Sequence, residues 1–127
     1  MKKINMVDLN GQYRKIRWQV NREIKKVIKS SSFINGPIVK EFQKNLQEYL
    51  NVRHVIPCAN GTDALQIALM ALDLKKGDEI ITTNFSFAST IEVILLLGLK
   101  PVIVDIDPRT FNIDPSLIES KITERTK

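Results

Sequence analysis

The sequence predicts an α/β fold, with a mainly parallel sheet and flanking helices, preceded by a helical arm. Over residues 53–127, short apolar runs alternate with longer stretches of helical periodicity, and this alternation is typical of βαβ units. Before them, apolar residues recur at helical spacing between positions 13 and 28, with basic residues between them, as in an amphipathic helix. We therefore expect a helical arm over residues 1–52 and an α/β domain over residues 53–127.

The individual elements follow from periodicity and from helix-breaking residues. Ser30-Ser31-Ser32 predicts the end of the first helix, and Gly36-Pro37 predicts a turn before a second helix at about 38–50. Gly98 suits a helix C-cap, and Asp114-Pro115 predicts the start of a last helix. Between these helices we expect, in order, strand 54–57, helix 62–73, strand 79–83, helix 87–97 and strand 101–105.

Composition limits the class of protein. The 127 residues are 43% hydrophobic and 26% charged, as in a soluble globular domain. No apolar run approaches the ~20 residues of a membrane span, and no long apolar segment follows the N-terminal lysines as it would in a signal peptide. We therefore expect no membrane partner. The single cysteine, Cys58, excludes an internal disulfide and suits a cytoplasmic protein, and we expect it to be a small buried residue.

The net charge of +5 is compatible with two kinds of partner. One is a nucleic acid, and the other is a substrate that carries a diphosphate and a carboxylate. The basic stripe of the first helix lacks interleaved aromatic residues and a recognised nucleic-acid motif. We therefore expect this stripe to be a solvated helix face, and we expect no nucleic-acid partner.

The segment Cys58–Gln66 carries the strongest chemical signal. It places a small polar turn between a predicted strand and a predicted helix, where N–H groups without intrahelical partners and the positive end of the helix dipole favour an anion. Gly61 permits close approach of the backbone, Thr62 offers a hydroxyl, and either Asn60 or Thr62 could cap the helix. These local features alone favour an ordinary capped helix over a phosphate-binding turn.

The other candidate sites are weaker. Asp105-Ile106-Asp107 has the form of a DxD motif that holds a nucleotide diphosphate through a divalent ion, but Asp107-Pro108 predicts a turn. His54 has no cysteine or carboxylate at the spacing of metal ligands. We therefore expect no metal site.

Five short motifs occur in order along the second half of the chain: Gly61–Leu65, Gly77–Thr82, Phe85–Thr90, Leu97–Val102 and Val104–Pro108. Their order and spacing resemble the DegT/DnrJ/EryC1/StrS family of pyridoxal-phosphate sugar aminotransferases, over about residues 8–127. Cys58–Gln66 and Asp105–Thr110 are most similar to the members that aminate the 3-oxo group of a UDP-N-acetyl-hexuronate.

The resemblance implies a fold-type I large domain, of which this chain holds an incomplete N-terminal part, and pyridoxal 5′-phosphate as cofactor. Gly61, Thr62 and the backbone N–H of Asp63 match the family's phosphate cup. We expect the Asp63 side chain to be a first-turn carboxylate that the helix dipole stabilises, and not a catalytic group. Phe87 matches the ring over the pyridine face, with Phe85 as the nearby competitor. The family's Schiff-base lysine lies downstream, so we expect no catalytic residue here and no activity from this chain alone.

The resemblance also implies partners and a reaction. These are a homodimer, an amino donor such as glutamate, and a 3- or 4-oxo sugar nucleotide as acceptor, most specifically a UDP-linked 3-oxo-hexuronate for surface polysaccharide synthesis. Two alternatives stay open. One is a PMP-dependent sugar dehydratase of the same family, in which histidine replaces the lysine. The other is a non-catalytic truncated remnant that self-associates through exposed apolar helices.

Overall fold

The computed structural model describes residues 6–127, which fall into two compact units. One unit ends at Pro57, and the other runs from Cys58 to Lys127. The expected domains, 1–52 and 53–127, stay a prediction, because compactness does not show that either part folds alone. No helix in this described part of the chain is long and apolar enough to cross a membrane.

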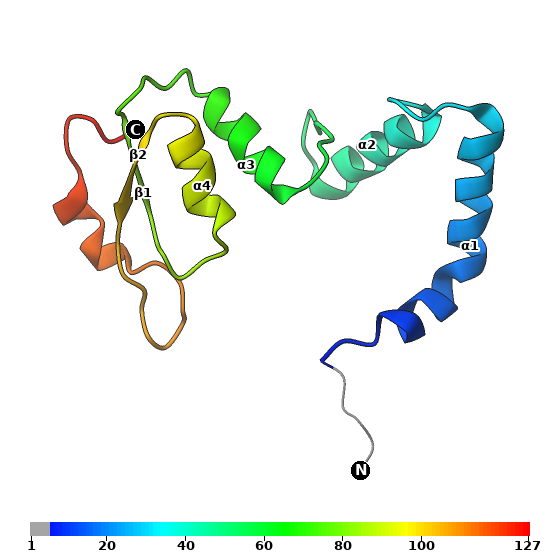
Figure 1. Ribbon diagram of the computed structural model, residues 1–127, viewed down its shortest axis with the longest axis horizontal. Helices are drawn as coiled ribbons and strands as arrows, with labels where there is room; N and C mark the ends of the chain where they lie inside the picture. The colour runs from blue at the N-terminus through cyan, green and yellow to red at the C-terminus, as the bar shows by residue number, and fades with distance from the viewer. Residues whose placement is uncertain (1–5) are drawn as a thin grey trace, which may run out of the picture. The chain divides into compact units, whose positions relative to one another are not determined.

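The first unit contains two helices, α1 (Leu9–Ser30) and α2 (Pro37–Leu50) (Figure 1). Asp8 caps α1, because its carboxylate accepts the N–H of Gly11 at 2.9 Å. The helix ends where Ser31 adopts a left-handed conformation with φ of 51°. Both helices begin and end within a few residues of the predicted positions. Neither contains a buried residue, so the predicted apolar stripe of α1 is largely exposed to solvent.

The expected strand at 54–57 is wrong, because these residues lie outside any helix or strand. A strand needs a neighbouring strand to satisfy its N–H and C=O groups. No described strand pairs with this segment, and side chains of α2 bind one carbonyl within it and one just before it. Gln43 Nε2 donates to the Val55 carbonyl at 3.0 Å, and Gln47 Nε2 donates to the Arg53 carbonyl at 3.1 Å.

The second unit is built on a parallel pair of strands, β1 (Glu79–Thr82) and β2 (Lys100–Ile103), with Glu79 opposite Lys100. Helix α4 (Ser89–Leu96) connects them, and α3 (Gly61–Met70) precedes them. Figure 1 shows that α3 and α4 both run opposite to β1, so their N-termini lie at the end of the sheet where the strands finish. The predicted α/β class with parallel strands is confirmed.

The core of this unit is small. Its buried apolar side chains come from α4 and from the residues that flank or follow β2, namely Val93, Ile94, Leu99 and Val104. Helix α4 packs against α3 and both strands. Both helices are shorter than predicted, and α3 contains no buried residue. Much of the apolar surface of α3 and α4 is therefore uncovered within residues 58–127.

The expected last helix begins at Asp114-Pro115 as predicted, but it is short and not an α-helix. Two short 3-10 turns, Pro115–Leu117 and Glu119–Lys121, replace it, and Asp114 caps the first by accepting the N–H of Ser116 at 2.9 Å. Beyond them the chain turns extended and pairs with β1 in parallel: Thr126 lies opposite Glu79.

Candidate functional site

At the N-terminus of α3, Asn60 and Asp63 are joined by two hydrogen bonds that cap one of the backbone donors. Asn60 Oδ1 accepts the N–H of Asp63 at 2.9 Å, and Asn60 Nδ2 donates to Asp63 Oδ2 at 3.2 Å. Asn60, and not Thr62, is therefore the cap. The backbone N–H of Asp63, expected to face a phosphate, is already bonded within the chain.

Two backbone donors at this helix end are open. Within residues 6–127, neither the N–H of Gly61 nor that of Thr62 has a hydrogen-bond partner. A Cβ atom added to Gly61 would meet nothing within 4 Å, and φ at this glycine is not positive. Nothing inside the chain therefore requires glycine here. Open space, two free N–H groups and the positive end of the helix dipole fit a phosphate group.

Cys58 lies just before this helix and is exposed, so its expected burial is wrong. Its Sγ donates to the Asn60 carbonyl at 3.4 Å. The side chain is exposed because no strand forms at 54–57 to bring neighbouring structure over this turn.

The loop that follows β1 carries the two candidate aromatic rings, and the structure distinguishes them. Phe85 stacks on Phe111, with ring centroids 5.7 Å apart and an interplanar angle of 23°. Phe87 makes no such pair among the described residues, and it is 78% exposed. The loop is tied to the start of α4, because the N–H of Thr90 donates to the Phe87 carbonyl at 3.1 Å and Ser86 Oγ lies 3.1 Å from Thr90 Oγ1.

A hollow of about 190 Å³ lies between α3, β1 and α4. Its only side chains with polar atoms are those of Thr82 and Thr90, and the rest are apolar: Leu65, Ala68, Leu69, Leu72, Ile80, Ile81, Val93 and Ile94. No titratable group lines it, so this hollow offers packing surface and no acid–base chemistry.

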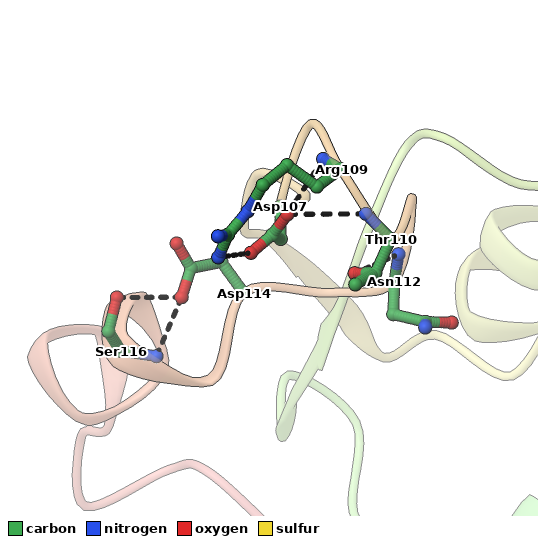
Figure 2. A network of polar contacts seen from close by, with 6 residues as sticks. All are labelled: Asp107, Arg109, Thr110, Asn112, Asp114 and Ser116. Atoms are coloured by element: carbon green, nitrogen blue, oxygen red, sulfur yellow. Dashed lines mark hydrogen bonds and ion pairs between the residues drawn. The ribbon is translucent and has the colours of Figure 1, made fainter.

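The acidic residues after β2 form a turn. Figure 2 shows Asp107 at its centre, where one carboxylate oxygen accepts the N–H groups of Arg109 and Thr110 at 2.7 and 3.2 Å. The hydrogen bond from the Arg109 guanidinium, at 3.2 Å, is the main cause that holds the pKa of Asp107 below its usual range. The predicted turn at Asp107-Pro108 is confirmed. No group of three His, Cys, Asp or Glu residues in the described chain is arranged to hold a metal.

Phe111, the partner of Phe85, has no signal in the sequence. It lies at the far side of the Asp107 turn with a left-handed φ of 59°. Glycine or a small polar residue in a sequence predicts such a conformation, whereas a bulky aromatic residue does not. The nearest available clue is the turn itself, which brings the loop after β2 towards the loop after β1.

A sequence model of the DegT/DnrJ/EryC1/StrS aminotransferase family matches residues 14–127. The chain belongs to the DegT/DnrJ/EryC1/StrS aminotransferase family. The resemblance carried by the five short motifs is thus confirmed, and it extends over the helices of the first unit.

Curated relatives and solved structures agree with this assignment. The UDP-2-acetamido-2-deoxy-3-oxo-D-glucuronate aminotransferase of Pseudomonas aeruginosa is 47% identical over 124 residues, which cover 98% of this chain and 34% of that protein. The 3-oxo-glucose-6-phosphate:glutamate aminotransferase of Bacillus subtilis is 46% identical, over 80% of this chain and 23% of that protein. A family aminotransferase from Brucella abortus superposes with a TM-score of 0.88 at 44% identity, over 92% of this chain and 31% of that one.

One solved relative catalyses a different reaction. The GDP-4-keto-6-deoxy-D-mannose-3-dehydratase of E. coli, with bound hydrated PLP, is 30% identical with a TM-score of 0.77, over 84% of this chain and 29% of that one. The chain spans about a third of the length of the first curated relative, at 34%. Within that span, the expected fold is confirmed: the chain has the α/β architecture of the N-terminal part of a PLP fold-type I enzyme.

Proposed function

We propose that this chain supplies the phosphate-binding part of a pyridoxal-phosphate-dependent aminotransferase that acts on a nucleotide-linked oxo-sugar. The observation that carries the proposal is the open N-terminus of α3, where Gly61 and Thr62 present unpaired backbone N–H groups. These groups and the Thr62 hydroxyl would hold the cofactor phosphate. When bound, pyridoxal 5′-phosphate would supply an electron sink that stabilises negative charge at the substrate carbon during amino transfer.

Asp63 has a narrower part in this proposal than its position in the motif suggests. Its N–H is bonded to Asn60, so in this structure it supports the helix end and leaves Gly61 and Thr62 as the donors. Its carboxylate is one side of the reciprocal cap. Direct contact of Asp63 with phosphate would require this cap to open.

Phe87 is proposed to lie against the flat face of the cofactor's pyridine ring. Its ring is largely exposed, whereas Phe85 is engaged with Phe111. A large exposed aromatic side chain gains free energy when a flat ring covers it, on the order of 1 kcal/mol beyond the burial itself. The loop is at the same end of the sheet as the N-terminus of α3 (Figure 1).

The substrates proposed are a UDP-linked 3-oxo-hexuronate as acceptor and glutamate as amino donor. The name of the Pseudomonas relative supports the acceptor, and the name of the Bacillus relative supports glutamate as the donor. The net charge of +5 suits an acceptor with a diphosphate and a carboxylate. The product would feed surface polysaccharide synthesis in the cytoplasm. We further propose that the complete enzyme is a homodimer.

The 127 residues alone are proposed to be inactive, because the family resemblance places the lysine that binds the cofactor covalently further along the sequence. Borohydride reduction after incubation with pyridoxal 5′-phosphate, followed by peptide mapping, tests this. We expect scattered labelling of surface lysines. A single stoichiometric lysine adduct would contradict the proposal.

Two alternatives have specific support. The likeness to the E. coli dehydratase supports a dehydratase that uses the same cofactor site. The exposed apolar side chains of α3 and α4 support a non-catalytic remnant that self-associates. A histidine in place of the downstream lysine would favour the dehydratase. A native protein that ends at Lys127 would favour the remnant.

Ligand binding by the full chain tests the phosphate site. The probe is pyridoxine 5′-phosphate, which lacks the aldehyde and so does not react with lysines. We expect Thr62→Ala to raise its Kd by roughly tenfold or more in calorimetric titrations, since a hydrogen bond to a charged group contributes ~1.5–3 kcal/mol. Gly61→Val should also raise it, because the valine side chain would fill the open space beside the backbone donors. Thr90→Ala is the comparison variant: it removes only a hydroxyl contact with Ser86 and should raise the Kd less than either substitution at the helix end. Equal losses in all three variants, or no loss in any, would remove the basis for this site.

A further inference from the structure

We infer that Phe111 is a positioning residue: its ring holds Phe85 and thereby fixes the 83–88 loop that presents Phe87. The importance of Phe87 rests on the proposed function. The effect of Phe111 on the loop rests on geometry alone and can be measured without a cofactor.

The aromatic pair connects two loops that leave the same end of the sheet. Phe85 lies on the loop after β1, and Phe111 lies on the turn after β2. Their rings are stacked at 5.7 Å and 23°, within the range of a favourable aromatic pair. Both side chains are 59% exposed, so the contact joins two surface loops and is not part of the buried core.

The backbone of Phe111 is unusual for its residue type. The other non-glycine residues with positive φ among residues 6–127 are small and polar, namely Ser31, Asn35, Asn51 and Asp73. Such residues tolerate a left-handed conformation, whereas a bulky aromatic residue adopts it at a free-energy cost. A residue kept in that conformation despite the cost points to a use for its side chain, and the contact with Phe85 is the use that the structure shows.

The turn is held by groups other than the Phe111 ring. The N–H of Phe111 donates to the Asp107 carbonyl at 2.8 Å, and the N–H of Asp107 donates to the Asn112 carbonyl at 2.9 Å. An antiparallel bridge between Ile106 and Ile113 closes the turn, and Figure 2 shows the Asp107 side chain bonded inside it. Removal of the ring should therefore leave the turn intact.

The 83–88 loop is fixed on both sides of Phe87. On one side, the N–H of Phe85 donates to Thr83 Oγ1 at 3.1 Å and its ring stacks on Phe111. On the other side, the Phe87 carbonyl accepts the N–H of Thr90. Loss of the aromatic pair would release one side and allow the loop more conformations. The Phe87 ring would then lose more conformational entropy when it stacks on a ligand.

Hydrogen–deuterium exchange of the full chain tests the effect on the loop. Phe111→Asn keeps a residue that tolerates the left-handed conformation and removes the ring, and Phe111→Tyr keeps the ring. We expect exchange over residues 83–90 to rise by roughly two- to tenfold in Phe111→Asn, the factor that corresponds to the free energy of an aromatic pair. Exchange over 105–114 should not change, and Phe111→Tyr should match the wild type. Unchanged exchange over 83–90 in Phe111→Asn, or an equal rise over 105–114, would overturn the inference.

Titrations with two ligands distinguish an effect of Phe111 on the position of Phe87 from a general loss of the binding site. We expect Phe111→Asn to raise the Kd of pyridoxine 5′-phosphate by roughly two- to tenfold and to leave the Kd of inorganic phosphate unchanged, because only the first ligand has a ring for Phe87. Equal weakening of both ligands would overturn positioning through Phe87. If the wild type binds neither ligand, the proposed function fails, and the exchange measurements still decide whether Phe111 fixes the loop.

Discussion

Glu79 is the buried carboxylate of the second unit, with 6% of its surface exposed. Its two oxygens bind different parts of the chain: Oε2 accepts from Thr123 Oγ1 at 2.6 Å, and Oε1 accepts from Lys100 Nζ at 2.9 Å. The Thr123 hydrogen bond, followed by that of Lys100, holds the pKa of Glu79 below its ordinary value of 4.5. One side chain thus joins β1, β2 and the C-terminal segment.

The lowered pKa of Glu79 predicts a pH dependence of stability. Well above pH 4.5 the carboxylate is ionised in both the folded and the unfolded state, and its contribution to the free energy of unfolding is complete. This contribution is lost as the pH falls through the lower pKa of the folded state. Urea unfolding at a series of pH values should show a smaller acid-induced loss in Glu79→Gln than in the wild type. Thr123→Val should move the acid-induced loss of stability towards higher pH, because it removes the main hydrogen bond that lowers the pKa of Glu79. Identical pH profiles for Glu79→Gln and the wild type would contradict this.

At the scale of the element, the cap of α3 has two roles that substitution can separate. Asn60→Ala removes the acceptor of the Asp63 N–H and should lower the free energy of unfolding by about 1 kcal/mol. Asn60→Asp keeps an acceptor for the Asp63 N–H but places a second carboxylate beside that of Asp63, so it should lower stability less than Asn60→Ala and weaken binding of pyridoxine 5′-phosphate more, through charge repulsion. Denaturant unfolding and calorimetric titration measure the two effects. Parallel losses of stability and binding in both variants would show that the roles are not separate.

At the scale of the whole molecule, the second unit leaves much apolar surface uncovered. Leu72 is 63% exposed and Leu96 is 72% exposed, and Met70 and Leu95 are also exposed. A contiguous apolar surface on a folded protein favours association.

The exposed leucines predict self-association of the 127-residue chain. Sedimentation velocity should show a concentration-dependent average mass that falls towards the monomer in Leu72→Lys/Leu96→Lys, because two apolar contacts are replaced by charges. Glu124→Lys, at an exposed polar position, is the control for added positive charge. A wild-type chain that stays monomeric at every concentration would contradict this prediction and weaken the remnant alternative.

Features that depend on near neighbours along the chain were predictable from local patterns. Helical spacing and caps are local, so the helices α1 to α4 were predictable, as were the alternation that gives parallel strands and the turn at Asp107-Pro108. The order of the short motifs determined the family. The open donors of Gly61 and Thr62 also follow from local rules, since the first turn of any helix has unpaired N–H groups.

Features that need a distant partner were not predictable from local patterns. Residues 54–57 lie outside any helix or strand, no described strand pairs with them, and the Val55 carbonyl accepts from Gln43 Nε2 of α2 instead. Two 3-10 helices stand where one α-helix was expected, and the chain after them returns to β1 at the Thr126–Glu79 bridge. Phe111 has a left-handed backbone and contacts Phe85 between two loops, and neither feature has a signal in the sequence. Strand pairing and contacts between loops join segments whose separation local periodicity does not encode, and this is why they had to be seen in three dimensions.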